Sequence, residues 1–141
     1  MSILAYDPFK ADSDTDPTAE FVDLDRLVKE CDVICLACNL TAESHHIINR
    51  DRLQMMKPET VVINVSRGPL VDEAALTEAL RKGWIAGAGL DVFEVEPLPE
   101  SSELRTFPNV VFGSHNANNL HSAVEYVHTS TISNAEIILA G

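Results

Sequence analysis

Short apolar runs alternate with helical patterns along this chain, and the alternation constrains its fold more than any other feature of the sequence. The apolar runs predict strands at residues 2–6, 32–37, 60–65, 85–90 and 109–112. Helical spacing of apolar side chains predicts helices at 23–31, 49–56, 72–82 and from Ser122 onward, with Asp23, Asp72 and Ser122 as N-caps. Strands that alternate with helices are typical of a parallel sheet, because parallel neighbours need a crossover between them. The sequence therefore predicts a single α/β unit with a parallel sheet covered by helices.

The second predicted strand carries an expectation about burial. Residues 32–37 are almost continuously apolar, which is typical of a strand that is buried on both faces. Cys31, Cys35 and Cys38 lie in or beside this strand, and reduced, buried thiols are expected because the odd, clustered count is a poor disulfide framework. Cys35 and Cys38 also have the spacing of a redox or zinc pair, but no second Cys or His pair follows at a matching distance.

The chain is acidic, and its charge excludes two classes of partner. Its formal net charge is −12, from 22 acidic and 10 basic residues among 141. No segment concentrates Lys and Arg as a phosphate backbone or an anionic lipid surface requires, so neither nucleic acid nor a membrane is expected as a partner. No signal peptide or membrane-spanning run is recognisable, so the expected location is the cytoplasm. No metal site is expected, and four histidines are predicted to be surface residues: His45, His46, His121 and His128.

Three polar side chains follow three different strands of the predicted sheet. Arg67 follows the third predicted strand, Glu96 the fourth and His115 the fifth. Each alone is most often an ordinary loop residue, but the carboxyl ends of parallel strands meet at one edge, where ligands bind. Arg offers a planar fork for a carboxylate, His exchanges a proton near neutral pH, and a carboxylate beside the His stabilises its charged form. The combination predicts a site for an α-hydroxy or α-keto acid.

Three longer motifs contain these residues and carry a resemblance to a known family. They are NVSRGPLVDE at 64–73, GLDVFEVEP at 89–97 and GSHN at 113–116. In this order, with helical segments between them, they resemble the D-isomer-specific 2-hydroxyacid dehydrogenases. CNLT at 38–41 and GSHN resemble the phosphoglycerate-dehydrogenase-like branch of that family. The resemblance covers nearly the whole chain but less than half of a typical family member.

The resemblance implies an oxidoreductase that transfers a hydride between NAD and the C2 carbon of a small 2-hydroxyacid or 2-ketoacid, such as a phosphoglycerate-type substrate. It implies that Arg67 binds the substrate carboxylate, that His115 exchanges a proton with the hydroxyl, and that Glu96 pairs with His115. Asp7, at the end of the first predicted strand, would accept hydrogen bonds from ribose hydroxyls and favour NAD over NADP. The residues implied to contact NAD are Asp7, Cys38, Asn39, Val65, Ser66, Arg67, Asp91, His115 and Asn118.

The family has a Rossmann-type doubly wound parallel sheet, and the resemblance implies that three parts of a family member are absent from this sequence. None of the six glycines forms a GxGxxG turn, which the family keeps, together with the strand before it, directly upstream of the strand at 2–6. Residues 1–141 are therefore expected to form a partial NAD-binding domain, without the first strand, the glycine-rich loop or the substrate-binding domain.

The absent strand has a consequence for the sheet. In the strand order 3-2-1-4-5-6 it separates residues 2–6 from the later strands. Either this strand lies displaced or pairs with another chain, or the sheet closes differently and exposes edges that invite association. The resemblance also implies a homodimer, or a chain that completes the fold. A second hypothesis is a non-catalytic nucleotide-binding or protein-interaction module derived from the same fold.

Overall fold

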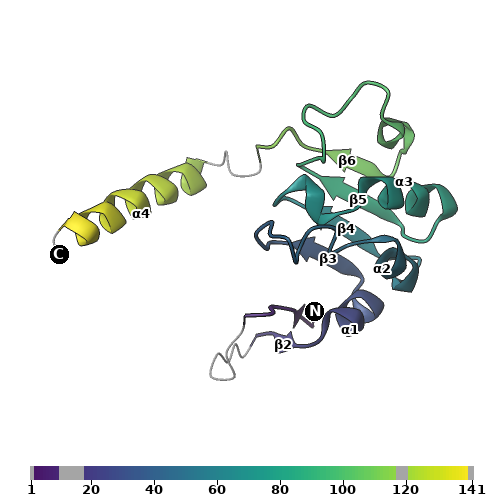
Figure 1. The fold of residues 1–141 in the computed structure, drawn as a ribbon, viewed down its shortest axis with the longest axis horizontal. Coiled ribbons are helices and arrows are strands. Elements are labelled where there is room, and N and C mark those ends of the chain that lie inside the picture. Colours follow the sequence, from purple (N-terminus) through teal and green to yellow (C-terminus); the bar gives the residue numbers. More distant parts are fainter. Residues whose placement is uncertain (1, 10–17, 117–120, 140–141) are drawn as a thin grey trace.

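The computed structural model describes residues 2–9, 18–116 and 121–139, in which parallel strands and helices alternate (Figure 1). In chain order, the elements are β1 (Leu4–Ala5), β2 (Glu20–Phe21), α1 (Leu24–Glu30), β3 (Val33–Leu36), α2 (Arg50–Met55), β4 (Val61–Asn64), the 3-10 turn η1 (Gly68–Leu70), α3 (Glu73–Lys82), β5 (Gly87–Leu90), the 3-10 turn η2 (Glu103–Thr106), β6 (Val110–Phe112) and α4 (His121–Leu139). Every observed strand except β2 lies within a predicted range, and the α/β class is confirmed.

The strands form two separate parallel sheets. One contains β3, β4, β5 and β6 in chain order, and the other contains β1 and β2. Leu4 and Ala5 of β1 pair with Glu20 and Phe21 of β2. Figure 1 shows this pair of strands beside the edge strand β3. The prediction that the first strand lies apart from the main sheet is confirmed, and its partner is β2 of the same chain.

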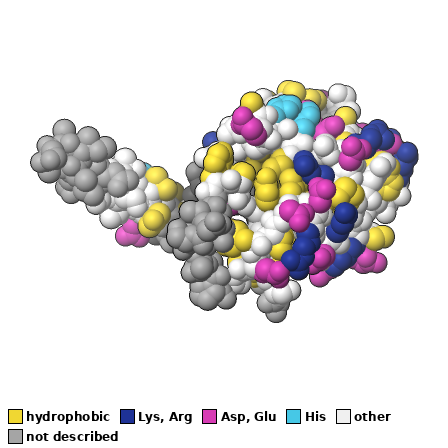
Figure 2. All heavy atoms as spheres, turned by 60° about the horizontal axis from the view of Figure 1, so that its bottom comes forward, with side chains coloured by type: hydrophobic (Ala, Val, Ile, Leu, Met, Phe, Trp, Pro, Cys, Tyr) yellow, Lys and Arg dark blue, Asp and Glu magenta, His cyan; other side chains and the backbone are white. Residues whose placement is uncertain are grey.

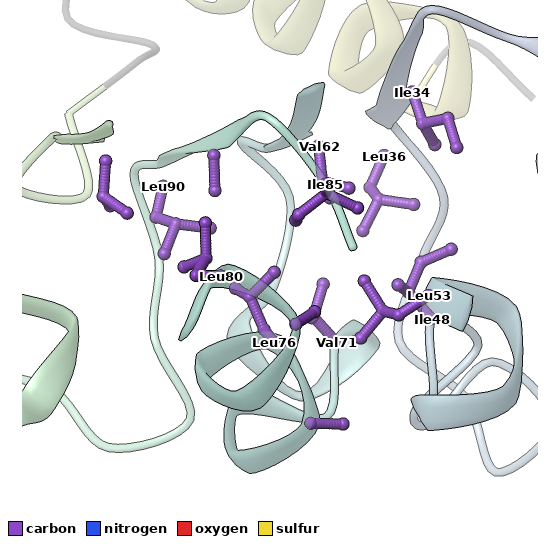
Figure 3. Packing of buried hydrophobic residues seen from close by; sticks show 14 of the residues in the cluster. Ile34, Leu36, Ile48, Leu53, Val62, Val71, Leu76, Leu80, Ile85 and Leu90 are labelled. Atoms are coloured by element: carbon purple, nitrogen blue, oxygen red, sulfur yellow. The ribbon is translucent and has the colours of Figure 1, made fainter. Parts of the chain in front are cut away.

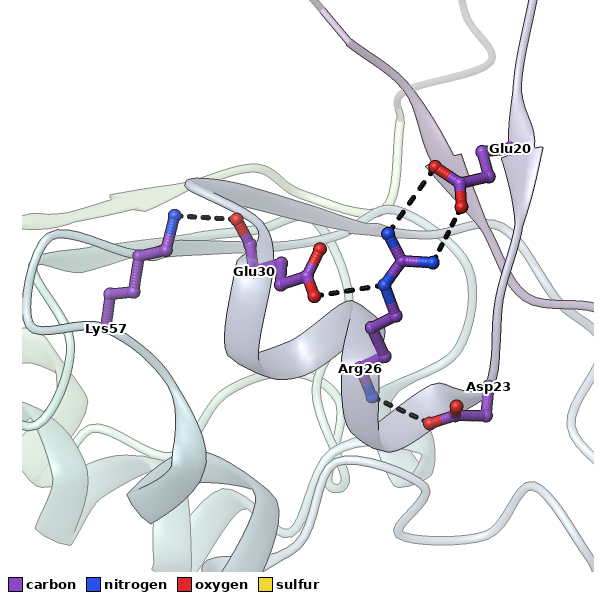
Figure 4. A network of polar contacts seen from close by, with 5 residues as sticks. All are labelled: Glu20, Asp23, Arg26, Glu30 and Lys57. Carbon is purple, nitrogen blue, oxygen red and sulfur yellow. Dashed lines mark hydrogen bonds and ion pairs between the residues drawn. The ribbon is translucent and has the colours of Figure 1, made fainter.

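A network of polar side chains fastens β2 to α1 (Figure 4). The Arg26 guanidinium donates to the Glu20 carboxylate, at 2.6 Å from Nη1, and to the Glu30 carboxylate, at 3.0 Å from Nε. Lys57 extends the network, since its Nζ donates to the Glu30 carbonyl oxygen at 2.6 Å and to the Asp32 carboxylate at 2.7 Å. Because the guanidinium contacts carboxylates on both sides, it fixes the two-stranded sheet relative to the helix.

The helix ends follow local sequence signals at α1 and α3. The Asp23 carboxylate accepts a hydrogen bond from the Arg26 N–H at 2.8 Å, and the Asp72 carboxylate accepts one from the Ala75 N–H at 2.9 Å. Gly83 ends α3 with a φ of 66°, in the left-handed region that glycine adopts without strain. Both predicted N-caps are confirmed at these helices.

The start of α4 differs from the prediction. Within the described residues α4 runs from His121, so Ser122 lies inside the helix and does not precede it as an N-cap does. A Ser–Glu spacing identifies a possible start only, because the boundary depends on which backbone N–H groups find partners. Figure 1 shows α4 extending away from the sheets, and Val124 and Val127 on it are 38% and 53% exposed.

The main core lies between the four-stranded sheet and the helices α1, α2 and α3. Figure 3 shows apolar side chains from the sheet meeting apolar side chains from the helices. The labelled members of this cluster are Ile34, Leu36, Ile48, Leu53, Val62, Val71, Leu76, Leu80, Ile85 and Leu90. Burying a side chain of this size stabilises the fold by about 1.5–3 kcal/mol, and the cluster therefore holds the carboxyl ends of β4, β5 and β6 in fixed positions.

The strand β3 is buried on one face only, which corrects the prediction of burial on both faces. Ile34 and Leu36 are 3% and 7% exposed, whereas Val33 is 55% exposed and Cys35 is also exposed. Successive side chains of a strand point to opposite faces, and only one face of β3 packs against the helix-covered core. Cys35 and Cys38 are exposed and Cys31 is half-buried, so the expectation of buried thiols is wrong for the first two.

Charged side chains of both signs are mixed on the surface. On the face drawn in Figure 2, Lys and Arg lie among Asp and Glu and form no continuous basic area. Within the described ranges, no helix is both long and apolar enough to cross a membrane.

Gly68 tests the close approach between the loop that follows β4 and the loop that follows β5. A Cβ at this position would overlap the carbonyl oxygen of Phe93, in the loop after β5. We expect Gly68→Ala to lower the free energy of unfolding by about 1–3 kcal/mol, because backbone must move to make room. Gly89→Ala is the matched control, since its Cβ would lie 3.8 Å from Ile63 Cγ1, an ordinary contact. Urea unfolding of both variants is the measurement, and equal stabilities would contradict the close approach.

Candidate active site

The carboxyl end of β4 forms a tight turn that presents Arg67. Asn64, which is 1% exposed, accepts a hydrogen bond from the Ser66 N–H at 3.1 Å and donates to the Arg67 carbonyl oxygen at 2.9 Å. A buried amide with both ends bonded holds the backbone of this turn in one conformation. The Arg67 side chain is exposed, and its Nη1 donates to the Ser66 carbonyl oxygen at 2.7 Å.

The carboxyl ends of β5 and β6 are joined through Asp91. The Asp91 carbonyl oxygen accepts a hydrogen bond from the His115 N–H at 2.8 Å, and its carboxylate accepts one from the Asn116 N–H at 3.2 Å. A Cβ on Gly113 would overlap that carboxylate, so a larger residue would push the two loops apart. His115 itself has a φ of 57°, a left-handed backbone that is uncommon outside glycine.

Glu96 and His115 form a direct pair at this edge of the sheet. The Glu96 Oε2 lies 2.7 Å from His115 Nδ1, and the Glu96 Oε1 accepts a hydrogen bond from the Phe93 N–H at 3.0 Å. The hydrogen bond to His115 is the main reason that the pKa of Glu96 lies below its usual range, followed by the Phe93 N–H and by the charges of His115 and Arg67. Glu96 therefore stays ionised into mildly acidic solution and can accept a hydrogen bond from the protonated Nδ1 of His115.

A cavity of about 480 Å³ lies against this pair. Its walls include the charged and aromatic side chains of Asp91, Phe93, Glu96, Arg105, Phe112 and His115. The rings of Phe93 and Phe112 have their centroids 6.1 Å apart. A cavity with apolar walls and a few convergent polar groups suits a small organic acid. The sequence carried no signal for Arg105 or the two Phe side chains, because each is ordinary in its local context.

Arg67, Glu96 and His115 thus lie on three neighbouring loops, as their positions after successive strands predict. Glu96 and His115 are in contact, and Arg67 is close enough for its charge to lower the pKa of Glu96. Arg67 does not line the cavity. The Glu96 carboxylate accepts a hydrogen bond from the His115 Nδ1. The other ring nitrogen, Nε2, is therefore the one that can exchange a proton with a bound molecule.

Seven of the nine residues implied to contact NAD follow the strands of the main sheet. Cys38 and Ser66 meet, since the Ser66 hydroxyl donates to the Cys38 carbonyl oxygen at 2.6 Å, and Asn39 follows directly. Val65 is 45% exposed at the end of β4. Val65, Ser66, Arg67, Asp91 and His115 all lie at the carboxyl ends of β4, β5 and β6.

The remaining NAD positions are separate from these. Asp7 follows β1, in the other sheet, and its carboxylate accepts a hydrogen bond from the Phe9 N–H at 2.9 Å. Asn118 lies outside the described residues. The strand-end residues lie at the edge of the sheet where dinucleotides bind in doubly wound folds. The sequence has no glycine turn of the kind that binds a pyrophosphate.

Known proteins resemble this chain in sequence. A family model described as D-isomer specific 2-hydroxyacid dehydrogenase, NAD binding domain, matches residues 1–117. A glyoxylate/hydroxypyruvate reductase B from Enterobacter agglomerans is 46% identical over 123 residues, which are 87% of this chain and 38% of that protein. A glyoxylate reductase from Thermofilum pendens is 50% identical over 99 residues, which are 70% of this chain and 29% of that protein.

Solved structures resemble the chain in fold. A glyoxylate reductase from Paecilomyes thermophila superimposes with a TM-score of 0.85 at 32% identity, over 96% of this chain and 41% of that one. An NAD-complexed D-isomer specific 2-hydroxyacid dehydrogenase from Lactobacillus delbrueckii ssp. bulgaricus superimposes with a TM-score of 0.82 at 30% identity, over 99% of this chain and 46% of that one. The chain spans about two fifths or less of the curated relatives named above. The names of these relatives do not single out the phosphoglycerate-dehydrogenase-like branch.

Proposed function

We propose that this chain, which belongs to the D-isomer specific 2-hydroxyacid dehydrogenase family, forms the NAD-binding half of a reductase that converts small 2-ketoacids to 2-hydroxyacids. The observation that carries the proposal is the Glu96–His115 pair beside the cavity, at 2.7 Å. Glyoxylate and hydroxypyruvate are the proposed substrates, since reductases of these acids are 46% and 50% identical to the matching parts of the chain. They replace the phosphoglycerate-type substrate that the sequence motifs favoured.

Each side chain of the site has a role in this proposal. Arg67 binds the carboxylate of the 2-ketoacid and draws electron density from its carbonyl group. His115 donates a proton from Nε2 to the carbonyl oxygen as the hydroxyl forms, and Glu96 holds Nδ1 so that Nε2 points to the substrate. NAD, in its reduced form, supplies the hydride that adds to C2. Asp91 keeps His115 in place through the hydrogen bond to its backbone N–H.

The cofactor would be held along the carboxyl ends of the strands. Val65 and Ser66 would lie under the nicotinamide end with Asp91 beside it, and Cys38 and Asn39 would lie beside the adenosine. Asp7 would accept hydrogen bonds from the adenosine ribose and exclude a 2′-phosphate. The pyrophosphate requires backbone N–H groups from a glycine turn, which another part of the complete protein would supply.

A further strand is the second part of this proposal. β1 and β3 each pair on one side only within the described residues, and Figure 1 shows them as neighbouring edges of the two sheets. A strand from the same polypeptide, or from a chain that completes the fold, would join the sheets and bring the glycine turn beside Asp7.

The homodimer and the cytoplasmic location stay predictions.

A non-catalytic module is the less favoured function. A protein that only bound a nucleotide or a partner would have no use for a carboxylate that orients a histidine beside a cavity. The family membership and the Glu96–His115 geometry both favour the enzyme.

The proposed reductase can be tested with the complete protein. We expect turnover of glyoxylate and hydroxypyruvate with NADH, followed by the NADH absorbance at about 340 nm. The rate with NADPH is expected to be about tenfold lower or more, because Asp7 repels the extra phosphate.

The isolated chain is expected to bind NAD more weakly than about micromolar by isothermal titration, since its sequence offers no pyrophosphate turn. Glu100→Gln, an exposed loop substitution, is the control for unaltered activity. Absence of turnover with every 2-ketoacid would contradict the proposed function, and micromolar NAD binding by the chain alone would contradict the missing turn.

A further inference from the structure

A second polar cluster lies outside the proposed catalytic pair and joins two loops to the start of α3. It consists of His46, Glu73 and Glu94. The His46 Nε2 lies 2.7 Å from the Glu94 Oε1, and both side chains are about one-third exposed, at 35% and 33%. His46 was expected to be a surface histidine, and its side chain is indeed partly exposed, but it also has a carboxylate partner that the sequence did not predict.

The two carboxylates of this cluster are bonded to each other's backbone. The Glu94 N–H donates to the Glu73 Oε2 at 3.1 Å, and the Glu73 N–H donates to the Glu94 Oε1 at 3.3 Å. Burial, and then the charge of Glu94, raise the pKa of Glu73. The His46 ring therefore contacts a carboxylate that is itself tied to the start of α3.

The backbone of His46 is held on a rigid support. Its N–H donates to the Pro69 carbonyl oxygen at 2.8 Å, and Ile48, two residues later, is 1% exposed and forms a β-bridge with Val71. The segment of His46 is therefore fixed to the segment that follows Arg67. A side chain on such a support can define the position of a loop that it contacts.

That loop carries Glu96. The peptide between Phe93 and Glu94 is held from one side by His46 and Glu73, through the contacts of Glu94. The next peptide toward the N-terminus, between Val92 and Phe93, carries the Phe93 N–H, which donates to the Glu96 Oε1 at 3.0 Å, and this hydrogen bond directs the other oxygen of Glu96 to His115. The two peptides share the Cα of Phe93, so a shift of the Phe93–Glu94 peptide is transmitted to the donor that orients Glu96.

We propose that His46 and Glu94 form a positioning pair that fixes the Phe93–Glu94 peptide and thereby holds Glu96 against His115. Neither residue touches the reacting atoms. The geometric part of this inference stands on the contacts above, and its consequence for turnover rests on the proposed function.

The test uses the chain itself and follows the Glu96 carboxyl by 13C NMR titration. His46→Asn removes the contact, because its side chain is too short to reach Glu94, yet Asn tolerates the left-handed backbone that His46 adopts at a φ of 51°. Glu94→Ala removes the same contact from the other side. We expect the pKa of Glu96, which lies below its usual range in the unaltered chain, to rise toward that range in both variants.

Conservative variants separate positioning from a general loss of structure. His46→Gln retains a donor near the place of Nε2, and Glu94→Gln retains an acceptor, so both are expected to keep the pKa of Glu96 low. The double variant His46→Asn with Glu94→Ala is expected to shift the pKa of Glu96 no further than Glu94→Ala alone, because Glu94→Ala already removes the contact with His46 together with the one to the Glu73 N–H. Glu100→Gln is the control. An unchanged pKa of Glu96 in His46→Asn and Glu94→Ala would overturn the proposal, as would independent, additive shifts.

A kinetic arm distinguishes failure of this inference from failure of the proposed function. In the complete protein, His46→Asn is expected to lower the kcat for 2-ketoacid reduction about tenfold while the KM for NADH is unchanged. If the unaltered complete protein reduces no 2-ketoacid, the proposed function fails and the titration still decides the positioning role. If it is active and both removal variants retain full kcat, the positioning role fails alone.

Discussion

His115→Asn is expected to lower the kcat for 2-ketoacid reduction by the complete protein about 10²–10⁴-fold, the range for removal of a general acid. Asn is the informative replacement for two reasons. It tolerates the left-handed backbone of His115, whose φ is 57°, and its amide can still donate to Glu96 as Nδ1 does. The loss would therefore report the missing proton donor at Nε2 rather than a collapse of the loop.

The measurement for His115 is steady-state kinetics, with NADH binding followed by fluorescence. Binding of NADH is expected to change little, because proton transfer to the substrate takes no part in it. His128→Asn is the matched control, since His128 is exposed on α4. The kcat of this variant is expected to stay within about twofold of the kcat of the unaltered protein. Retention of more than about half the activity in His115→Asn would remove this residue from the proton transfer.

Arg67→Gln is expected to lower kcat/KM for 2-ketoacids about 10²–10³-fold, equivalent to about 3–4 kcal/mol of lost binding to the reacting substrate. The guanidinium presents two parallel donors to a carboxylate, and a neutral amide replaces neither the charge nor the geometry. The neighbouring turn is expected to survive, because the amide of Asn64 holds its backbone independently of the Arg67 side chain.

Two further variants sharpen the result for Arg67. Arg67→Lys keeps the charge without the fork, so its kcat/KM is expected to lie between those of the unaltered protein and Arg67→Gln. Arg81→Gln is the control, since Arg81 is on α3 and pairs with Glu103 on the surface. NAD affinity, measured by isothermal titration of the complete protein, is expected to stay close to its unaltered value. A normal kcat/KM in Arg67→Gln would exclude the proposed role of this residue in substrate binding.

Features set by neighbours along the chain could be predicted from the sequence. Asp23 and Asp72 cap their helices because a side chain that precedes a helix reaches N–H groups only three residues ahead. The strand ranges follow from short apolar runs between turn residues, and the family follows from three motifs in a fixed order. Each of these depends on local spacing, which the sequence contains in full.

Burial in the main sheet could not be predicted in the same way. The apolar run at 32–37 forms a strand, but its exposure depends on whether something packs on each face, and Val33 and Cys35 lie on the face away from the helix-covered core. β2 was missed because Glu20 and Phe21 have no strand pattern of their own and become a strand by pairing with β1. Pairing and packing partners are distant in sequence, and their contribution outweighs local propensity.

The sequence by itself determined the order of elements, the capped helices and the placing of Arg67, Glu96 and His115 after successive strands. Only the tertiary structure decided that Glu96 contacts His115, that Phe93, Phe112 and Arg105 line one cavity, and that His46 meets Glu94, which is 48 residues away along the chain. The physical reason is that a local pattern depends on backbone geometry over a few residues, whereas a contact between loops depends on the packed core that sets their distance. The core beneath β4, β5 and β6 brings these loops together, and the proposed chemistry depends on that arrangement.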